Sequence, residues 1–380
     1  MLLEVKGESR LPLLRLVNVT KRFGKISAIN NLNLEVNDGE YLCVLGPTGS
    51  GKTTLLRLIA GIINPDEGEI YIDNKIINNV PPQERNIAYV PQNYALFPHL
   101  SVIENVAFGP TSKGLDREEA YKISMNMLDM TRLAGRTDSL PNELSGGMQQ
   151  RLALARGLAS NASLLLLDEP LGALDARLRV ELRYKLRDLV KNRGFTAIHV
   201  THDQEEATIV GDRIAVLRQG QIQQINNPYT VYNEPRSIFV ANFVGGANFI
   251  EGYIIERDQQ GAWVQLRNRF IARIKENSYS PGERVVLAVR EELTEIVKRV
   301  SKKKEVNLFP GTIQLLSFVG SSMILEILLE NGDIVNSKIP IRQQKKELKI
   351  SERVYVQLQP ENIKIFPYPK IGLFRELEVM

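Results

Sequence analysis

The chain of 380 residues is poor in cross-linking and metal-binding side chains, with a single cysteine, Cys43, and three histidines. One cysteine cannot form a disulfide within the chain, and so few sulfur and imidazole ligands exclude the usual structural zinc sites. This composition is typical of a reducing compartment, most simply the cytosol.

The chain also lacks long apolar runs. No stretch approaches the roughly 20 apolar residues that span a bilayer, and the first ten residues, MLLEVKGESR, contain no apolar segment typical of a secretory signal. We therefore expect any membrane role to be peripheral. The net charge of +4 is small. The basic run at 302–304 is interpreted as a solvated loop, so no nucleic-acid partner is expected.

Residues from about 13 to 240 alternate between strand and helix patterns, which predicts an α/β domain with a mostly parallel sheet. Continuous apolar runs predict strands buried on both faces at 41–46, 163–169 and 196–203. A stripe of leucines predicts a helix over 176–192, with Asp175 as its N-cap and Gly194 at its end.

Two later regions have different patterns. From about 91 to 160 helical patterns dominate, for example at 117–130 behind Asp116, and we interpret this segment as an inserted helical subdomain. After about residue 244, short strand patterns alternate with Gly, Asn, Asp and Pro, which predicts an all-β domain. The predicted domains are therefore 1–243 and 244–380.

The second domain contains an internal repeat. ERVVLAVREELTEIV at 283–297 aligns without gaps to ERVYVQLQPENIKIF at 352–366. The match is weak in identity but strong in pattern, and it predicts two similar β modules that pack together. Coincidence between two strand-rich segments is the alternative.

The segment GPTGSGKT at 46–53 fits the phosphate-loop pattern G-x-x-x-x-G-K-[ST]. It follows a predicted strand and precedes a predicted helix, the setting in which this loop occurs. Gly49 and Gly51 let backbone N–H groups approach phosphate oxygens. Lys52 neutralises the β- and γ-phosphates, and the Thr53 hydroxyl coordinates Mg²⁺. The motif predicts binding of a nucleoside triphosphate.

An acidic motif, LLLLDEP, places Asp168 at the end of a buried strand, where it can hold Mg²⁺ through water. Glu169 follows directly and can polarise a water for attack on the γ-phosphate, a role worth roughly 10²- to 10⁴-fold in rate. We therefore favour hydrolysis over phosphoryl transfer to another substrate.

A second glycine-rich helix start occurs in LSGGMQQRLALAR at 144–156. Ser145 is a predicted N-cap. Gly146 and Gly147 leave the backbone N–H groups of the helix end accessible, which predicts a second anion site.

The order and spacing of these motifs, with THDQEEA at 201–207, resemble the ATPase subunit of an ABC transporter over residues 13 to about 243. The resemblance implies an α/β P-loop NTPase fold with ATP and Mg²⁺. It implies catalytic roles for Glu169, for His202 and for Gln92 in the loop VPQNYALF. The implied metal residues are Thr53, Gln92 and Asp168. The implied nucleotide-binding residues are Phe23 (in place of the adenine-stacking aromatic), Gly46, Pro47, Thr48, Gly49, Ser50, Gly51, Lys52, Thr53, Thr54, Ser145, Gly146, Gly147, Asp168 and the D-loop residue Asp175.

Several of these residues have plainer alternatives. Gln92 could be an ordinary loop residue, and His202 a histidine at a strand end. Phe23 could be filler in an N-terminal hairpin. Asp175 could serve as the N-cap of its helix, alone or in addition to its implied role.

The C-terminal part resembles the linker and OB-like TOBE domain of importer ATPases, the group of the maltose, spermidine/putrescine and iron(III) importers. The resemblance rests on PYTVYNEPRSIFVANFVGGANFIEG at 228–252 and the repeat that follows. The family's R-P-E turn reads Arg290-Glu291-Glu292 in the first module and Gln359-Pro360-Glu361 in the second. Any regulatory contact that depends on this turn is therefore in doubt.

Other classes of ATPase fit less well. The interval between the phosphate loop and residue 144 has no sustained heptads and no cysteine pairs, which argues against DNA-repair and chromosome ATPases. A single phosphate loop argues against translation factors with two cassettes. A P-loop kinase would not need His202, and Glu169 with His202 argues against an inactive subunit.

The resemblance implies the motor subunit of an ABC importer at the cytoplasmic face of the cell membrane. It implies a dimer, with a homodimer favoured, in which each ATP lies between the phosphate loop of one subunit and the signature loop (144–147) of the other. In a single chain that loop should be exposed. Integral membrane permease subunits and, indirectly, a solute-binding protein are the implied partners. A polyamine or iron(III) is favoured as the solute, with sugars and oxyanions left open.

Overall fold

The computed structural model describes residues 13–276, 278–298, 306–343 and 348–378, and the chain divides into two compact units between Glu234 and Pro235. The predictions for the first ten residues and for the basic run 302–304 lie outside the described residues. No helix in the described part of the chain is long and apolar enough to cross a membrane.

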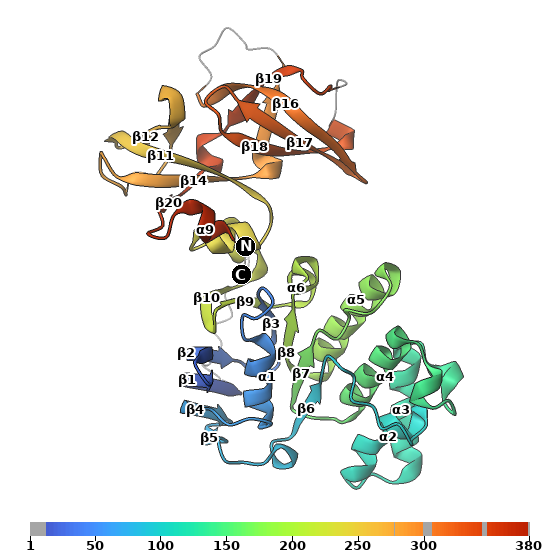
Figure 1. Ribbon diagram of the computed structural model, residues 1–380. Helices are drawn as coiled ribbons and strands as arrows, with labels where there is room; N and C mark the ends of the chain where they lie inside the picture. Colours follow the sequence, from blue (N-terminus) through green and yellow to red (C-terminus); the bar gives the residue numbers. More distant parts are fainter. Residues whose placement is uncertain (1–12, 277, 299–305, 344–347, 379–380) are drawn as a thin grey trace, which may run out of the picture. The chain divides into compact units, whose positions relative to one another are not determined.

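The first unit contains two sheets (Figure 1). An antiparallel sheet has the order β2-β1-β4-β5, with β1 Leu14–Phe23, β2 Ile26–Val36, β4 Glu67–Ile72 and β5 Lys75–Ile76. A six-stranded sheet has the order β10-β9-β3-β8-β7-β6, with β3 Tyr41–Leu45, β6 Ile87–Val90, β7 Leu164–Asp168, β8 Thr196–Thr201, β9 Arg213–Arg218 and β10 Gln221–Asn226. Its strands are parallel except for β10.

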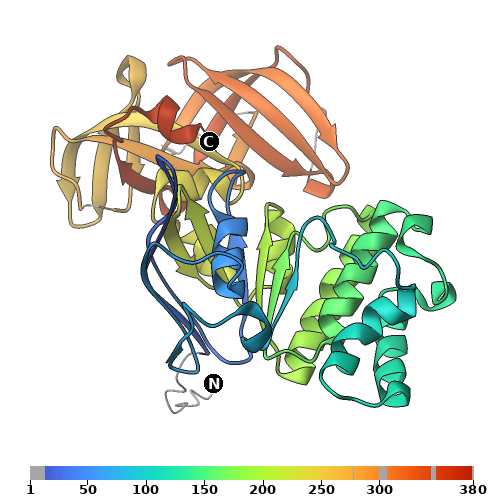
Figure 2. The same ribbon diagram turned by 60° about the horizontal axis from the view of Figure 1, so that its bottom comes forward.

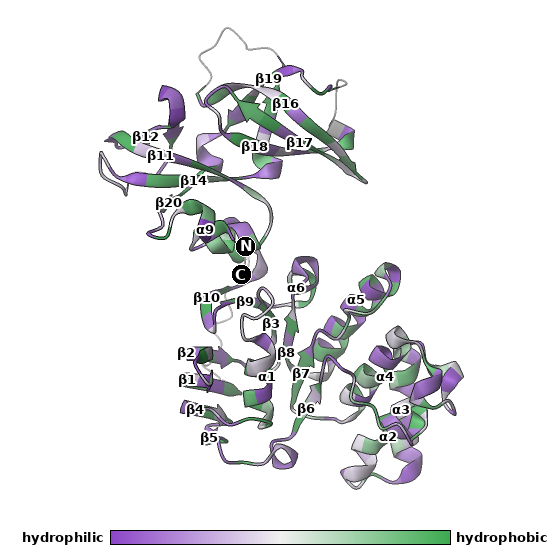
Figure 3. Ribbon diagram, in the orientation of Figure 1, coloured by the Kyte–Doolittle hydropathy of each residue, from purple (hydrophilic) through white to green (hydrophobic). Residues whose placement is uncertain are grey.

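The core of the first unit explains its continuous apolar runs. Every residue of β3, β7 and β8 is buried, as expected for strands covered on both faces, and Figure 3 shows hydrophobic residues along this sheet. Helix α1, Lys52–Ala60, lies between the two sheets and adds Leu55, Leu56 and Ile59 to their common core. Core burial therefore anchors the strand before the phosphate loop and the helix after it.

Segment 91–160 is helical, as predicted, and contains α2 Val102–Ser112, α3 Arg117–Met130 and α4 Gly146–Ala159. These three helices contact one another (Figure 2). The Asp116 carboxylate caps α3 by accepting the Glu119 N–H at 3.0 Å. Ser101 and Glu104 form a capping box at the start of α2.

Three further helices complete the first unit: α5 Ala176–Arg193, α6 Gln204–Val210 and α7 Pro228–Asn233. The predicted ends of α5 are confirmed. The Asp175 carboxylate accepts the Leu178 N–H at 3.0 Å, and Gly194 adopts the left-handed conformation that ends many helices.

The described part of the second unit contains two five-stranded sheets and two short α-helices. One sheet has the order β13-β12-β11-β14-β20, with β11 Ala247–Asp258, β12 Gly261–Gln265, β13 Ile271–Ile274, β14 Arg284–Arg290 and β20 Lys364–Pro367. The other has the order β18-β17-β16-β19-β15, with β15 Thr294–Val297, β16 Leu308–Val319, β17 Ser322–Leu329, β18 Ile334–Pro340 and β19 Arg353–Leu358.

The two halves of the internal repeat exchange strands. Each half is a strand, a 3₁₀ turn and a second strand: β14, Glu291–Leu293 and β15 in the first half, and β19, Pro360–Asn362 and β20 in the second. However, β14 pairs with β20 and β15 pairs with β19. Each half therefore places its two strands in different sheets, an exchange that the repeat alone did not predict.

Two local features differ from the sequence interpretation. The segment WVQLRNRFIARI at 263–274, which the sequence pattern favours as one short strand, is a hairpin of β12 and β13, because Asn268 and Arg269 between them adopt left-handed conformations. The division between the units falls before the predicted boundary at residue 243. Helix α8, Ile238–Phe243, packs with α9, Leu373–Leu377, and with β14 and β20 of the second unit.

Candidate active site

The phosphate loop connects β3 to α1, and two of its glycines are required by close packing. A Cβ on Gly51 would lie 2.3 Å from the Ala28 carbonyl oxygen, and Gly51 has φ +104°. A Cβ on Gly46 would lie 2.4 Å from the Leu217 carbonyl oxygen. Gly49 also has a positive φ, of +81°. The loop can fold in this way only with glycine at these positions.

The Lys52 side chain is buried and folded back onto the loop, where its ammonium group donates to the Gly46 and Pro47 carbonyl oxygens at 2.9 Å each. Burial lowers the pKa of Lys52, although Glu169 and Asp168 act in the opposite direction. A phosphate group would offer this cation a stronger, charged acceptor than two carbonyls.

Ser50 supplies a direct test of whether the loop suits a phosphate. Its hydroxyl oxygen is buried and has no hydrogen-bond partner among the described residues. A buried polar atom without a partner is rare, and it indicates a missing ligand or water. A phosphate oxygen would accept the Ser50 hydroxyl, so the loop fits the ligand that its sequence predicts.

Thr53 and Asp168 lie together beside the loop, with Thr53 Oγ1 3.2 Å from Asp168 Oδ1. Asp168 is buried at the end of β7, and burial raises its pKa. Hydroxyl and carboxylate oxygens are the ligands that Mg²⁺ prefers, and a cation here would reverse the unfavourable effect of burial. The pair therefore fits the predicted metal site.

The sequence interpretation missed Tyr89, at the end of β6. Its hydroxyl donates to Asp168 Oδ2 at 3.2 Å, and burial raises the pKa of Tyr89 to about 12. Tyr89 remains a neutral donor at physiological pH and holds the oxygen of Asp168 that Thr53 does not contact. A cavity of about 230 Å³ opens here, lined by Thr53, Arg57, Tyr89, Pro91, Gln92, Asn93 and Asp168.

Glu169 lies between the two other predicted catalytic side chains. Gln92 Nε2 donates to Glu169 Oε2 at 3.2 Å, and His202 Nδ1 lies 3.2 Å from Glu169 Oε1. Gln92 lines the cavity beside Asp168, but its amide contacts Glu169 rather than the Thr53–Asp168 pair. The three residues extend from the carboxyl ends of β6, β7 and β8, the edge at which parallel sheets bind ligands.

The backbone of Glu169 is strained and tightly held. Glu169 has φ +50°, a left-handed conformation that is unfavourable for a residue with a side chain. Its N–H donates to the Val200 carbonyl oxygen at 2.9 Å. Its carbonyl accepts Gln150 Nε2 at 2.9 Å, and Gln150 Oε1 accepts the Ala173 N–H at 2.8 Å. Gln150, on α4, was also missed from the sequence.

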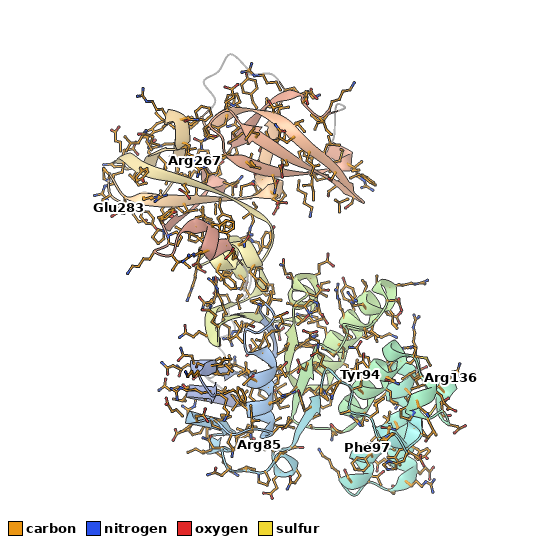
Figure 4. All side chains as sticks on the ribbon, viewed as in Figure 1. Arg85, Tyr94, Phe97, Arg136, Arg267 and Glu283 are labelled. Atoms are coloured by element: carbon orange, nitrogen blue, oxygen red, sulfur yellow. The ribbon has the colours of Figure 1, made fainter. Side chains whose placement is uncertain are left out.

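The loop after Gln92 is fastened to the helical segment. Tyr94 and Ala95 both adopt left-handed conformations, and the Arg156 guanidinium of α4 donates to their carbonyl oxygens at 3.1 and 2.9 Å. Arg156 also lies 5.0 Å from the centre of the Phe97 ring. Figure 4 labels Tyr94 and Phe97 in this loop.

The same figure labels Arg85, which is buried and donates to the Leu58 and Ile59 carbonyls at the end of α1.

The signature loop lies at the start of α4, with Ser145 and Gly146 exposed, as predicted for a single chain. The predicted N-cap position of Ser145 is confirmed, although its side chain makes no capping hydrogen bond. A Cβ on Gly147 would lie 3.1 Å from the Ala173 carbonyl oxygen. A Cβ on Gly146 would meet nothing within 4 Å.

The remaining predicted residues lie on the surface of their elements or at a cap. Phe23, at the end of β1, is half exposed, and the Lys21 ammonium lies 5.6 Å from its ring centre. Thr48 is exposed and Thr54 half-buried. Asp175 caps α5, and its D-loop role stays a prediction, as does the contact of Phe23 with adenine.

Comparison with known proteins agrees with this geometry. The family model described as "ABC transporter" matches residues 29–172. The spermidine/putrescine import ATP-binding protein PotA 2 of Pseudomonas aeruginosa is 40% identical over 87% of this chain and 91% of its own length. The spermidine/putrescine import ATP-binding protein PotA of Legionella pneumophila is 38% identical over 94% and 99%. The Fe(3+) ions import ATP-binding protein FbpC of Brucella abortus is 40% identical over 83% and 88%.

Among solved structures, a dimeric ATP-binding cassette in a post-hydrolysis state, bound to ADP and inorganic phosphate, is similar to the chain. It is 37% identical, with a TM-score of 0.54, and the match covers 57% of this chain and 98% of the cassette. The phosphate loop, the Asp168–Glu169 pair and relatives that match most of the chain lead to one conclusion: the protein belongs to the family of ABC transporter ATP-binding proteins of the importer type, and it is an ATPase.

Proposed function

We propose that the first unit binds ATP with Mg²⁺ and that Glu169 activates the water that attacks the γ-phosphate. The observation that carries this proposal is the position of Glu169, one residue beyond Asp168, with each carboxylate oxygen 3.2 Å from a catalytic candidate, Gln92 or His202. Two neighbours on different loops orient the carboxylate, as a general base requires.

The phosphate loop holds the substrate. Backbone N–H groups at the start of α1, the Ser50 hydroxyl and the Lys52 ammonium bind the β- and γ-phosphates, and Lys52 leaves its carbonyl acceptors to do so. Thr53 and Asp168 are the residues that would hold Mg²⁺. When bound, Mg²⁺ supplies positive charge that neutralises the phosphate oxygens during the reaction.

Glu169 then accepts a proton from water while the water oxygen forms a bond to the γ-phosphorus. The bond from that phosphorus to the bridging oxygen breaks, and ADP leaves with the electron pair. His202 donates to a γ-phosphate oxygen, and Gln92 keeps Glu169 and the water aligned.

The test is Glu169→Gln, which preserves size but removes the base. We expect a fall in kcat of about 10²- to 10⁴-fold, with ATP affinity close to that of the wild type. Turnover can be measured as phosphate release, and affinity by equilibrium binding of a fluorescent ATP analogue. ATPase activity near that of the wild type would contradict the role of Glu169.

We further propose that the chain works as a dimer in which the signature loop of one copy closes on the ATP of the other. Ser145 and Gly146 are exposed at the N-terminus of α4, a 14-residue helix with free N–H groups. The similar cassette described above is dimeric. Ser145→Arg in a Glu169→Gln background should block the ATP-dependent dimer in gel filtration but leave ATP binding intact. A dimer that persists would reject the trans site.

The transported solute is proposed to be a polyamine, with iron(III) as the second candidate. Curated relatives named for spermidine and putrescine import match up to 94% of this chain, and a relative named for Fe(3+) import matches 83%. Sugars and oxyanions are the remaining alternatives. We propose that this chain lies at the cytoplasmic face of the membrane, and that permease subunits, and through them a solute-binding protein, select the solute. Co-purified permease subunits in vesicles, assayed with a solute panel, would decide between these candidates.

The second unit is proposed to be an OB-like TOBE domain with a regulatory role. Its two five-stranded sheets, which share the strands of the internal repeat, support a separate all-β domain. The first turn, Arg290-Glu291-Glu292, uses its arginine internally, since Arg290 Nη1 donates to the Ala241 and Gly245 carbonyls. A contact that requires this arginine at the surface is therefore not proposed.

A further inference from the structure

A buried set of polar side chains lies on β3, β8 and α6, which Figure 1 labels, and it includes Thr201, the residue before His202. Tyr41 and His199 are fully buried, and Thr201 and Glu206 are at most 3% exposed. Ionisable groups are rarely buried to this degree unless they have partners, and holding them there is expensive. The hydrolysis mechanism described above uses none of the four.

The four side chains form a continuous chain of contacts. The Tyr41 hydroxyl lies 2.9 Å from His199 Nδ1. His199 Nε2 lies 3.1 Å from Glu206 Oε1, although these two atoms are not aligned as a hydrogen bond. The Thr201 hydroxyl donates to Glu206 Oε2 at 2.8 Å. Glu206 thus contacts two residues of β8: its Oε1 lies near His199 in the middle of the strand, and its Oε2 accepts the hydroxyl of Thr201 at the end of the strand.

The chain continues into the turn that carries His202. Thr201 Oγ1 accepts the Asp203 N–H at 3.0 Å, and the Asp203 carboxylate accepts the Glu206 N–H at 3.0 Å and an Arg183 N–H at 2.6 Å. Both neighbours of His202 are therefore fixed by side chains. The His202 ring itself is mostly exposed and touches Glu169.

The same end of β8 also holds Glu169, the residue that His202 contacts. The Glu169 N–H donates to the Val200 carbonyl oxygen at 2.9 Å. A small movement of residues 200–203 would change the spacing between His202 and Glu169 from both sides. Displacements of about 1 Å can reduce turnover by about a hundredfold.

The charge of Glu206 is stabilised by these contacts. Burial alone would raise its pKa, but His199, Thr201 and Arg183 more than offset burial, and the pKa lies below its ordinary value. Glu206 is therefore a carboxylate, and the hydrogen bond that it accepts from the Thr201 hydroxyl is charge-assisted. Such a bond restricts the turn more than a neutral one would.

We propose that Thr201, Glu206 and His199 are positioning residues that hold the His202 turn against Glu169. They set the rate of hydrolysis rather than the affinity for ATP. This inference rests on the proposed role of Glu169 and His202, and it adds a supporting layer that touches neither nucleotide nor metal.

Thr201→Val tests the proposal, because it removes the hydroxyl and keeps the shape. We expect kcat to fall about tenfold to a hundredfold, with the affinity for ATP unchanged. The melting temperature should fall by a few degrees, because the buried Glu206 carboxylate loses a donor. Thr201→Ser retains the hydroxyl and should restore turnover. Thr208→Val is the matched control, since Thr208 is an exposed residue of α6 whose hydroxyl bonds only within its helix, to Gln204.

A second readout follows the His202 ring itself by NMR. The chain has three histidines, His99, His199 and His202, so few ring signals must be assigned. Thr201→Val should shift the His202 signals, and Thr208→Val should not. Unchanged His202 signals together with wild-type kcat in Thr201→Val would overturn the proposal. So would equal losses in Thr201→Val and Thr201→Ser.

Glu169→Gln keeps this test separate from that of the proposed function. If Glu169→Gln abolishes turnover while Thr201→Val has no effect on kcat or the His202 signals, the positioning network is rejected and the role of Glu169 stands. If Glu169→Gln turns over at the wild-type rate, the proposed base is rejected. The His202 signals of Thr201→Val then still show whether the network holds the turn.

Discussion

The phosphate loop and the signature loop are both rich in glycine and both lead into a helix, but their surroundings restrict a side chain to different extents. In the phosphate loop, a side chain on Gly46 or Gly51 would collide with a main-chain oxygen of the same chain. In the signature loop, a side chain on Gly146 would meet nothing. The first loop needs glycine at positions 46 and 51 in order to fold. At position 146, no described residue of the same chain requires glycine. This difference favours a ligand or partner that approaches Gly146 from elsewhere.

The largest effect that separates the two loops is expected from Lys52→Ala. It removes the cation of the phosphate loop, and the affinity of the single chain for ATP should fall about a hundredfold or more. Equilibrium binding of a fluorescent ATP analogue measures this loss, with Lys75→Ala on exposed β5 as the control. Ser145→Ala, in the signature loop, should leave this affinity unchanged. Undiminished binding by Lys52→Ala would contradict the assignment of the phosphate loop.

The glycines themselves give the next contrast. Gly51→Ala places a Cβ 2.3 Å from the Ala28 carbonyl oxygen, and residue 51 must keep a φ of +104°. We therefore expect the free energy of unfolding to fall by about 3 kcal/mol. Gly146→Ala should instead raise the stability of the single chain by about 0.5 kcal/mol, because alanine favours a helix. Urea denaturation checks both values.

Activity then completes the comparison for Gly146. If the site across the dimer is correct, Gly146→Ala should reduce ATPase activity in spite of its greater stability. If the Gly146→Ala variant is both more stable and fully active, the proposal that ATP of a second copy approaches Gly146 is contradicted.

Acid should act on neither loop but on Glu206, which lies behind the His202 turn. The folded-state pKa of Glu206 lies below its ordinary value of 4.5, so its contribution to stability is complete above that pH and is lost as the pH falls through the folded-state pKa. Glu206→Gln should lower the free energy of unfolding by about 2 kcal/mol at pH 7. The deficit should shrink as the pH falls below 4.5. A deficit that is the same at all pH values would show that the charge of Glu206 is unimportant.

The smallest effect is expected at the cap of the signature helix. Ser145→Ala should change stability by less than about 0.5 kcal/mol, because Ser145 makes no capping hydrogen bond. Asp116→Ala at the start of α3 should cost about 1 kcal/mol, because Asp116 does cap its helix. Thermal unfolding of the two variants tests this difference. Equal losses would mean that Ser145 caps α4 in solution.

Local patterns predicted much of the first unit. The runs that became β3, β7 and β8 are buried along their whole length, and α5 begins and ends at the residues with the expected cap chemistry. These predictions succeeded because a continuous apolar run indicates a strand covered on both faces, whichever elements cover it, and because helix capping depends on neighbours within a few residues. Gln92, Glu169 and His202 also came from motifs, and they do meet.

Long-range contacts were the part that the sequence did not reveal. Tyr89 supports Asp168 from another strand, and Gln150 holds the loop of Glu169 from α4. Tyr89 lies outside the quoted motifs. Gln150 lies within LSGGMQQRLALAR, but nothing in that segment indicates that its amide meets Glu169. Likewise, nothing local distinguishes Glu206 of THDQEEA from its exposed neighbour Glu205 except the buried partners that it meets after folding.

The amino-acid sequence by itself determined which groups are available for the proposed chemistry: a glycine-rich loop predicted to hold phosphate, a carboxylate proposed for a metal, and a second carboxylate beside it. Residue type and short spacing suffice for these, because each depends on a few adjacent groups. Tertiary structure alone decided how β14, β15, β19 and β20 are shared between two sheets, since either pairing satisfies the same alternation of apolar side chains. It also decided which glycines the chain needs for itself, because that depends on whichever main-chain oxygen lies opposite.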